Sequence, residues 1–300
     1  MYLSRIHETR LSRAWISFFL GNGHRKSFLK DSMLLEKQFD TDGNQTLIKT
    51  DTGIWSTVYN AENRPISFLN EATGTMVECA YDRQGRRTYK KVSINGNITL
   101  HQRFIYRGYL QIACVDLTRS HYPALWLITW DPTQQTATRP LALQKDGTWY
   151  TYGWDLTKNI CEVYRNNGYI GTIYTYAPYG EVCSSGDIEQ PVQWSSEIHD
   201  STTCLTYYNF RNYSANHGTW TTRDFLETRK ISMYSYCQNR TMFDNDSLGL
   251  QCVLPHHSST GVPGGWESDN YRAIVETNRS WSLAIHNLHN WRHGKILENI

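Results

Sequence analysis

Polar and apolar side chains alternate over much of the chain between residues 39 and 250. The clearest example is 207–213, YYNFRNY, where aromatic residues are interleaved with polar ones. Successive side chains of a β-strand point to opposite faces, so this alternation predicts a half-buried strand. The turn-forming residues 216–218, NHG, follow, and Trp220 begins a second short strand. No helical period is sustained in this region, so we expect it to be β throughout.

Three segments rich in β-branched and aromatic residues predict longer strands. They are 103–117 (RFIYRGYLQIACVDL), 124–131 (ALWLITWD) and 147–164 (GTWYTYGWDLTKNICEVY). Prolines and glycines bound them, as expected for strands that end in turns. The residues 131–133, DPT, predict a hairpin.

Aromatic and turn-forming residues also recur with a period close to 20 residues. Units begin with Tyr or Phe followed by Asp or Asn in FDTDGNQT (39–46), YNAENRPISF (59–68) and YDRQGRRTYKKV (81–92), so their starts are 20 and 22 residues apart. The last clear member is TYAPYGEV (175–182). A short period of this kind indicates one repeated supersecondary unit, here a β-hairpin. An ordinary β-meander is the alternative interpretation.

Charged residues add a second pattern near the end of this region. Arg211 is followed by Asp224 thirteen residues later and by Asp246 after a further twenty-two. Asp246 opens the peptide DSLGL, in which Gly249 can adopt backbone angles that other residues avoid. Together with the Tyr/Phe-Asp units, this pattern resembles the RHS repeat-associated core domain, the closing segment of RHS/YD-repeat proteins.

The resemblance implies an all-β fold in which antiparallel hairpin repeats form a spiralling sheet that closes as a β-shell. This chain would supply an incomplete part of such a shell, followed by a small, partly helical C-terminal tail. We therefore expect an irregular N-terminal segment (1–35), a YD-repeat sheet (36–182), the core domain (183–250) and a variable C-terminal extension (251–300).

The resemblance also implies chemistry. Two neighbouring carboxylates that share a proton can activate water and polarise a peptide carbonyl, as in aspartic proteases. By similarity to the family, Arg211 is the orienting cation, Asp224 and Asp246 are the catalytic carboxylates, and the bond between Leu250 and Gln251 is cut. The chain would then be a single-turnover aspartic autoprotease.

The aspartate motifs depart from the family pattern, which commonly places proline and glycine after each aspartate. The first motif, DFLE, lacks both, and the second, DSLG, lacks the proline. Glu227 also adds a third acid near the pair. The alternative interpretation is that Arg211 and Asp224 form a buried ion pair while Asp246 caps a turn.

Composition changes this picture little. A net charge of +2 gives no electrostatic reason to expect nucleic acid or an anionic membrane as partner. No apolar run approaches the roughly 18 to 20 residues of a membrane helix. Seven scattered cysteines without a C-x-x-C pair indicate mainly buried thiols. His286, His289 and His293 would share one helix face, but no carboxylate-bearing metal motif accompanies them, and we expect no metal or cofactor.

Two functions from different classes remain open. One is a shell and autoprotease fragment of a bacterial polymorphic-toxin-like protein, with its own extension as cargo and an upstream RHS polypeptide or an immunity protein as partner. The other is a non-catalytic β-repeat surface protein in contact with carbohydrate; a degenerate RHS remnant without activity is a further alternative. No clear signal peptide precedes the repeats, so we expect a cytoplasmic chain that is later secreted or displayed at the cell surface.

Overall fold

The computed structural model describes residues 37–132, 139–224, 233–241, 244–246 and 248–250, and the backbone of residues 252–253. Within these residues the chain consists of antiparallel β-strands joined by turns and short 3-10 segments, which confirms the predicted all-β class. None of the described residues forms a helix long and apolar enough to cross a membrane. The expected irregular segment (1–35) and the expected helical content of the tail lie outside the described residues.

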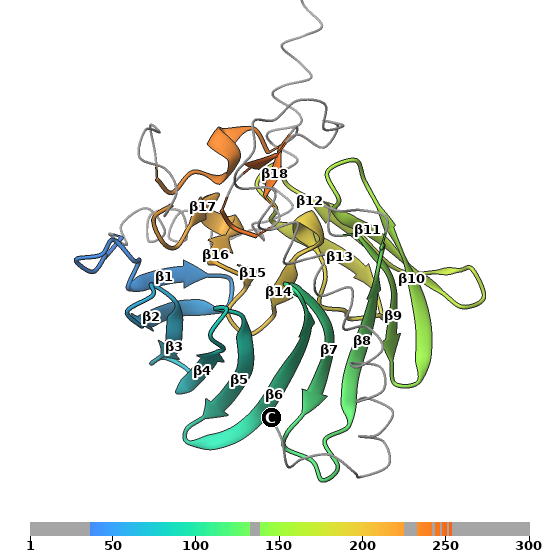
Figure 1. Cartoon of the computed structure of the whole chain (residues 1–300), viewed down its shortest axis with the longest axis horizontal. Helices are drawn as coiled ribbons and strands as arrows, with labels where there is room; N and C mark the ends of the chain where they lie inside the picture. Colours follow the sequence, from blue (N-terminus) through green and yellow to red (C-terminus); the bar gives the residue numbers. More distant parts are fainter. Residues whose placement is uncertain are drawn as a thin grey trace, which may run out of the picture. The chain divides into compact units, whose positions relative to one another are not determined.

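A sheet of thirteen strands dominates the described structure, and every strand pairs antiparallel with the next one in sequence (Figure 1). Its strands are β1 (Leu47–Thr50), β2 (Gly53–Tyr59), β3 (Pro65–Asn70), β4 (Thr75–Tyr81), β5 (Arg87–Ile94), β6 (Asn97–Arg107), β7 (Leu110–Asp116), β8 (Ala124–Trp130), β9 (Pro140–Lys145), β10 (Thr148–Trp154), β11 (Ile160–Arg165), β12 (Ile170–Tyr176) and β13 (Val182–Gly186). Sequential pairing needs only short hairpin connections, which suits a chain built from repeated hairpins. β13 crosses the boundary expected between residues 182 and 183, and the division into four parts stays a prediction.

One turn recurs between the strands, and the repeat units found in the sequence fall on it. In the unit that starts at residue 81, Asp82 Oδ1 accepts the N–H groups of Gln84 at 2.9 Å and Arg86 at 3.0 Å. The same acceptor bonds occur at Asp40, Asn60 and Asp155, and the fourth residue of each turn has a positive φ: Gly43, Asn63, Gly85 and Lys158. Gly180 also has a positive φ, but its turn starts at Ala177 and is closed by backbone hydrogen bonds alone. A side-chain acceptor followed by a residue in the left-handed region is typical of Asx-type turns. The short period in the sequence therefore corresponds to this turn.

Two of the three predicted long strands are hairpins, so those predictions were wrong. The segment 103–117 is divided between β6 and β7, because Gly108 takes a positive φ and reverses the chain. The segment 147–164 is divided between β10 and β11 by the turn that Asp155 stabilises through the N–H groups of Thr157 and Asn159. The prediction for 124–131 is confirmed by β8, which forms the expected hairpin with β9.

A second sheet carries the aromatic stretch that stood out in the sequence. It has four strands: β14 (Ile198–Asp200), β15 (Leu205–Tyr208), β16 (Arg211–Ser214) and β17 (Thr219–Trp220). The prediction of a half-buried strand was wrong, since every residue of β15 and β16 is buried. Tyr207 packs into the core of the large sheet, whereas Tyr208 packs on the opposite side with Trp194, Trp220 and Tyr236. A pair of short strands, β18 (Asn245–Asp246) and β19 (Cys252–Val253), follows.

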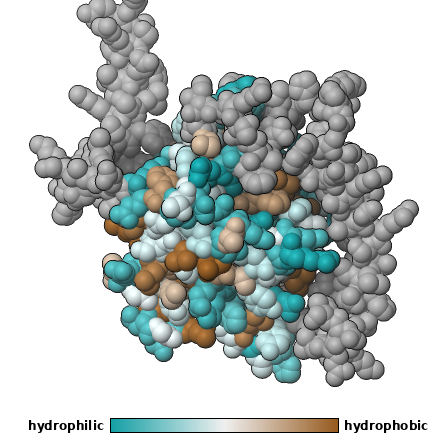
Figure 2. All heavy atoms as spheres, turned by 60° about the vertical axis from the view of Figure 1, so that its left-hand side comes forward, coloured by the Kyte–Doolittle hydropathy of each residue, from teal (hydrophilic) through white to brown (hydrophobic). Residues whose placement is uncertain are grey.

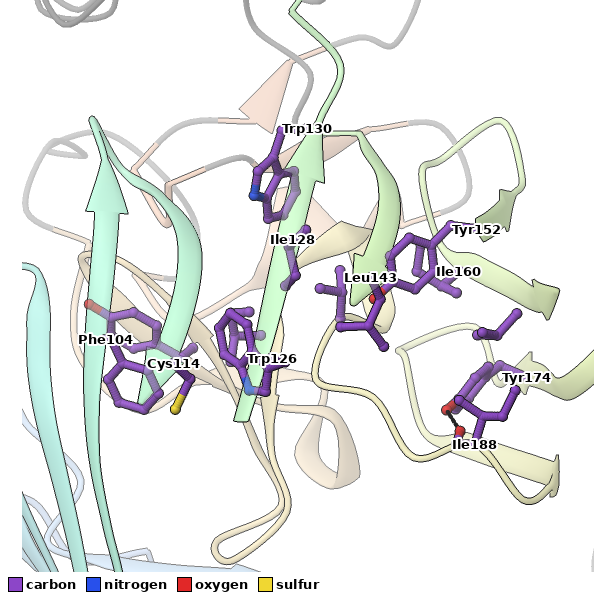
Figure 3. Close-up of a cluster of buried hydrophobic side chains, with 14 residues drawn as sticks. Phe104, Cys114, Trp126, Ile128, Trp130, Leu143, Tyr152, Ile160, Tyr174 and Ile188 are labelled. Carbon is purple, nitrogen blue, oxygen red and sulfur yellow. Dashed lines mark hydrogen bonds between the residues drawn. The ribbon is translucent and has the colours of Figure 1, made fainter. Parts of the chain in front are cut away.

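The main hydrophobic core joins the two sheets. It contains Phe104, Trp126 and Leu143 from β6, β8 and β9, and Ile198 and Tyr207 from the second sheet. Figure 3 shows this cluster, with aromatic and aliphatic side chains such as Phe104, Trp126 and Leu143 projecting from the strands of the large sheet. Burial of this apolar surface holds β14 and β15 against the large sheet.

A buried ion cluster provides a second link between the sheets. Asp200, in β14, accepts hydrogen bonds from Nη1 of Arg87 at 3.0 Å and from Nζ of Lys90 at 2.5 Å. Both cationic residues belong to β5. All three side chains are almost fully buried. Although burial opposes ionisation of Asp200, the two cations lower its pKa. The carboxylate is therefore ionised in the folded protein, and the cluster ties β14 to β5.

The face of β2 to β6 that points away from the core mixes apolar and polar side chains. Ile54, Val58, Met76 and Ile98 are exposed there. Figure 2 shows this mixture from one side, with brown apolar patches interrupted by teal polar ones.

The cysteines only partly follow the sequence expectation. Cys79 and Cys114 are buried free thiols, and Cys161, Cys183 and Cys204 are free and partly buried. Cys237, in contrast, is disulfide-bonded. The expectation of mainly buried thiols therefore holds for Cys79 and Cys114, but not for the three partly buried cysteines or for Cys237.

Candidate functional site

The three charged residues singled out in the sequence lie together. The Arg211 guanidinium contacts Asp224 Oδ2 through Nη1 at 3.1 Å and Asp246 Oδ2 through Nη2 at 3.4 Å. The exposed fractions of the three side chains are 6%, 8% and 1%. The two contacted carboxylate oxygens are bound by one guanidinium, so they are less than roughly 9 Å apart. The roles assigned to these residues stay predictions.

Two further contacts fix the orientation of Arg211. Its Nε donates to the carbonyl oxygen of Gly249 at 2.5 Å, and its guanidinium carbon lies 4.0 Å from the centre of the Trp220 ring. Pairing of β16 with β17 places the arginine and the tryptophan in neighbouring strands. Burial lowers the pKa of Arg211, and the two carboxylates oppose this effect. The guanidinium is thus held against the Trp220 ring and contacts three oxygens, one each from Asp224, Asp246 and Gly249.

The other oxygen of Asp246 organises the peptide that follows it. Asp246 Oδ1 accepts the N–H groups of Leu248 at 3.1 Å, Gly249 at 2.7 Å and Leu250 at 3.1 Å. Gly249 has a φ of 77°, and a Cβ there would lie 3.0 Å from the Cβ of Tyr208. Only glycine fits this turn without strain. The described residues 248–250 therefore wrap around one carboxylate oxygen and lead to the expected cleavage point.

Burial raises the pKa of Asp246, while Arg211 and the three backbone N–H groups oppose this rise. Desolvation dominates because the carboxyl is almost completely enclosed. A carboxyl in this state can hold a proton at a higher pH than an exposed aspartate. This property is required of one member of a proton-sharing pair.

Hydroxyl groups that sequence reasoning missed support the backbone of Asp246. Tyr208 donates to the hydroxyl of Tyr236 at 3.2 Å, which donates to Ser195 Oγ at 3.4 Å. Ser195 Oγ in turn donates to the carbonyl oxygen of Asp246 at 3.5 Å, and the Asp246 N–H donates to Tyr236 at 3.3 Å. No motif signals Ser195 or Tyr236, because their partners are distant in sequence.

Two further buried ionisable side chains were also missed. Lys158, 1% exposed, occupies the left-handed position of the recurrent turn, with a φ of 66°. Burial lowers its pKa, whereas the charges of Glu197 and Asp246 oppose this effect. Glu197 is itself buried. The turn sequence DLTKN could have placed Lys158 at the turn, but nothing local predicts that its side chain is buried.

Both contacts of the alternative interpretation are present: Arg211 and Asp224 form a buried ion pair, and Asp246 caps the turn at residues 248–250. The contact between Arg211 and Asp246 is additional to it. Gln251, Glu227 and the histidines of the tail lie outside the described residues. In the part of the chain that the structure describes, no cluster of three or more His, Cys, Asp or Glu side chains could hold a metal ion.

No protein-family model matches the chain. Among solved structures, the chain is similar to a TcdB2–TccC3 complex (TM-score 0.56, 19% identity), covering 71% of this chain and 11% of that one. It is also similar to the Photorhabdus luminescens Tc holotoxin pore with a TccC3 mutation (TM-score 0.55, 17% identity), covering 75% and 11%. A TcdB2–TccC3–Cdc42 structure gives a TM-score of 0.56 at 16% identity, covering 80% and 11%.

These similarities concern the fold, because the identities are low. TccC3 is an RHS-repeat-containing protein, so the described sheets have an RHS-like β-shell fold. The chain spans only 11% of the length of the chains that it matches.

Proposed function

We propose that this chain forms a closing part of an RHS-type β-shell and cuts its own backbone between Leu250 and Gln251. The observation that carries the proposal is the position of Arg211 between two buried carboxylates. One of these, Asp246, is also the residue around which the peptide 248–250 is wrapped. A reactive peptide held by its own catalytic group needs no substrate pocket, and the reaction occurs once per chain.

In the proposed reaction one aspartate is ionised and the other carries a proton. The ionised carboxylate accepts a proton from water, whose oxygen forms a bond to the Leu250 carbonyl carbon. The protonated carboxyl gives its proton to the carbonyl oxygen, producing a tetrahedral diol. The C–N bond then breaks as the first aspartate passes its proton to the leaving nitrogen and a diol hydroxyl returns a proton to the second. The products are a carboxyl group on Leu250 and an amino group on Gln251.

The missing proline of the DSLG motif does not weigh against this proposal. Three N–H groups bonded to Asp246 Oδ1 and the positive φ of Gly249 already define the turn. Asp224 lacks the family's proline and glycine, but its carboxylate is held by Arg211. Side-chain contacts thus support both carboxylates where the family uses turn residues.

The cargo of the proposed shell is the released segment, residues 251–300. A TcdB2–TccC3 structure is described as lacking a hypervariable C-terminal region, which supports treating the corresponding segment here as variable cargo. We further propose that an upstream RHS polypeptide extends the sheet at β1, which pairs only with β2 within the described residues. Export of such a chain would place it at the cell surface or outside the cell, where a protein of this kind delivers a toxic peptide.

The test uses the full chain with a different tag at each end. We expect a fragment of about 50 residues that begins at Gln251 by mass spectrometry. Asp246→Asn abolishes it, whereas Asp244→Asn is the matched control, since Asp244 is a nearby aspartate that pairs with Arg240 instead. A folded chain that stays intact, or equal cleavage in both variants, contradicts the proposal.

A carbohydrate-binding surface is the second candidate, favoured by exposed rings near β10 to β12. Trp149, Trp154 and Tyr169 are 44%, 37% and 74% exposed. Such rings can stack on sugars. Retention of the intact chain on a polysaccharide column, lost in Trp149→Ala, would select this function.

A further inference from the structure

The first repeat turn, residues 40–43, binds the segment that carries Asp224. Arg223, the residue directly before Asp224, donates from Nε to the carbonyl oxygen of Asp42 at 2.7 Å. A Cβ on Gly43 would lie 2.1 Å from the same Nε atom. The guanidinium is therefore seated against the backbone of this turn, in space that a side chain larger than that of glycine would fill.

Arg223 takes a place that an arginine of the preceding unit takes elsewhere among the repeats. At the turn of residues 82–85, Arg64 donates from Nη1 to the carbonyl oxygen of Gly85, and a Cβ on Gly85 would meet its guanidinium. Arg64 belongs to the unit before that turn. At the first turn, the arginine comes instead from a segment 181 residues after Asp42. This segment thus completes the first turn in the way that one repeat completes the next.

Further contacts hold the first repeat unit at its turn and on both sides of it. Tyr234 donates its hydroxyl to the carbonyl oxygen of Gly43 at 2.7 Å. The ring of Tyr234 also packs on that of Phe39, with the ring centres 5.3 Å apart. After the turn, the N–H of Gln45 donates to the carbonyl oxygen of Thr221 at 2.8 Å. The unit is therefore bonded to residues that lie before and after Asp224 in the chain.

Backbone pairing carries this anchorage to Asp224 itself. The N–H of Asp224 donates to the carbonyl oxygen of Met233, the residue before Tyr234, at 2.9 Å. Arg223 and Asp224 are consecutive but face different partners: Arg223 is exposed and bound to the repeat turn, whereas the Asp224 side chain is 8% exposed and contacts Arg211. The position of the Asp224 carboxylate thus depends on where the repeat turn holds its neighbours.

We propose that Arg223 is a positioning residue for the Arg211–Asp224 pair, and that cleavage depends on docking of the first repeat turn. The inference rests on the proposed autocleavage, in which Asp224 is one of the two reacting carboxyls. The turn is itself joined to the next repeat, because Asn44 donates from Nδ2 to Asn63 Oδ1 at 2.8 Å. A chain whose repeats have not yet folded lacks the contacts that place Asp224, so cleavage follows folding of the repeat sheet.

Loss of this anchorage should slow cleavage more than it lowers stability. A hydrogen bond at an exposed position contributes little to the free energy of unfolding. Displacement of a reacting group by about 1 Å, in contrast, can slow a reaction by about a hundredfold. We expect Arg223→Met to slow cleavage by about tenfold or more, with a urea midpoint close to that of the parent chain. Arg223→Lys, which can still donate to a carbonyl oxygen, should recover part of the rate.

The same contact can be broken from the side of the turn, with a matched control. Gly43→Ala puts a Cβ against Arg223 at a φ of 80°. Gly96→Ala meets the same backbone strain at a φ of 82°, but nothing lies within 4 Å of its Cβ. Both should lower stability through this strain, and only Gly43→Ala should slow cleavage. Arg86→Met is the control for Arg223→Met, because Arg86 also donates to a turn carbonyl, that of Gly108, but between β6 and β7.

The experiment measures cleavage of the full, doubly tagged chain and, separately, the NMR signal of the Arg211 side chain. Isotopic labelling of the arginines gives the Nε–H signal of Arg211, which is identified by its loss in Arg211→Lys. The NMR samples all carry Asp246→Asn, so that every chain is intact. This signal should shift in the two variants that break the contact and stay in place in the two controls.

The outcomes separate the two proposals. If the parent chain does not cleave, the proposed function fails, and the Arg211 signal alone decides the inference. An Arg211 signal that stays in place in both Arg223→Met and Gly43→Ala overturns the inference. Equal cleavage rates in Gly43→Ala and Gly96→Ala also overturn it, because backbone strain would then explain both.

Discussion

Replacement of Arg211 by lysine tests whether the shape of the guanidinium matters or only its charge. The arginine contacts Asp224, Asp246 and the Gly249 carbonyl, and its guanidinium carbon lies 4.0 Å from the centre of the Trp220 ring. A lysine ammonium keeps one charge but cannot make these contacts together, and it does not stack in the same way. Losing two hydrogen bonds that involve a charged group, together with the ring contact, should cost about 3–5 kcal/mol of the free energy of unfolding.

Urea unfolding followed by tryptophan fluorescence measures the free energy of unfolding, and electrophoresis of the doubly tagged chain measures cleavage. Arg86→Lys is the matched control, because Arg86 also contacts a carboxylate (Asp82), a carbonyl (Gly108) and a ring (Tyr106), but at a partly exposed position. We expect it to cost about 1 kcal/mol. If Arg211→Lys costs no more than this control and cleaves at the parent rate, the argument from geometry is wrong.

Three further substitutions test the surroundings. Gly249→Ala puts a Cβ at positive φ and 3.0 Å from the Tyr208 Cβ, so calorimetry should show a loss of about 1–3 kcal/mol, and an unchanged melting temperature would refute the steric argument. Asp200→Asn leaves two buried cations without a counter-ion and should cost about 3–5 kcal/mol at pH 7. The pKa of Asp200 is lowered in the folded parent protein, so the carboxylate stabilises the fold above about pH 4 and this stabilisation is lost as pH falls further. The urea midpoints of parent and variant should therefore converge in acid. A difference between the midpoints that does not change with pH would contradict this. Tyr236→Phe removes the acceptor of the Asp246 N–H and should cost about 1–2 kcal/mol, whereas equal urea midpoints would show that this bond contributes little.

The sequence by itself determined the fold class and the recurrent turn. Period-two alternation and turn residues are local properties, so they can be recognised without knowing which strands pair with each other. The same local reasoning failed at 147–164, where Asp155 makes a turn through its own side chain inside an apparently continuous strand. It also failed for β15, because burial of both faces depends on two sheets packing around it.

For the site, the sequence supplied the identities of Arg211, Asp224 and Asp246 through a spaced motif. Only the tertiary structure decided that one guanidinium contacts both carboxylates, and that Tyr236 and Ser195 bond to the backbone of Asp246. Residues more than thirty positions apart meet because β-sheet pairing and core packing fold the chain back on itself, and no local pattern encodes those distances. Desolvation, which sets the protonation of these groups, likewise exists only once the surrounding residues exclude water.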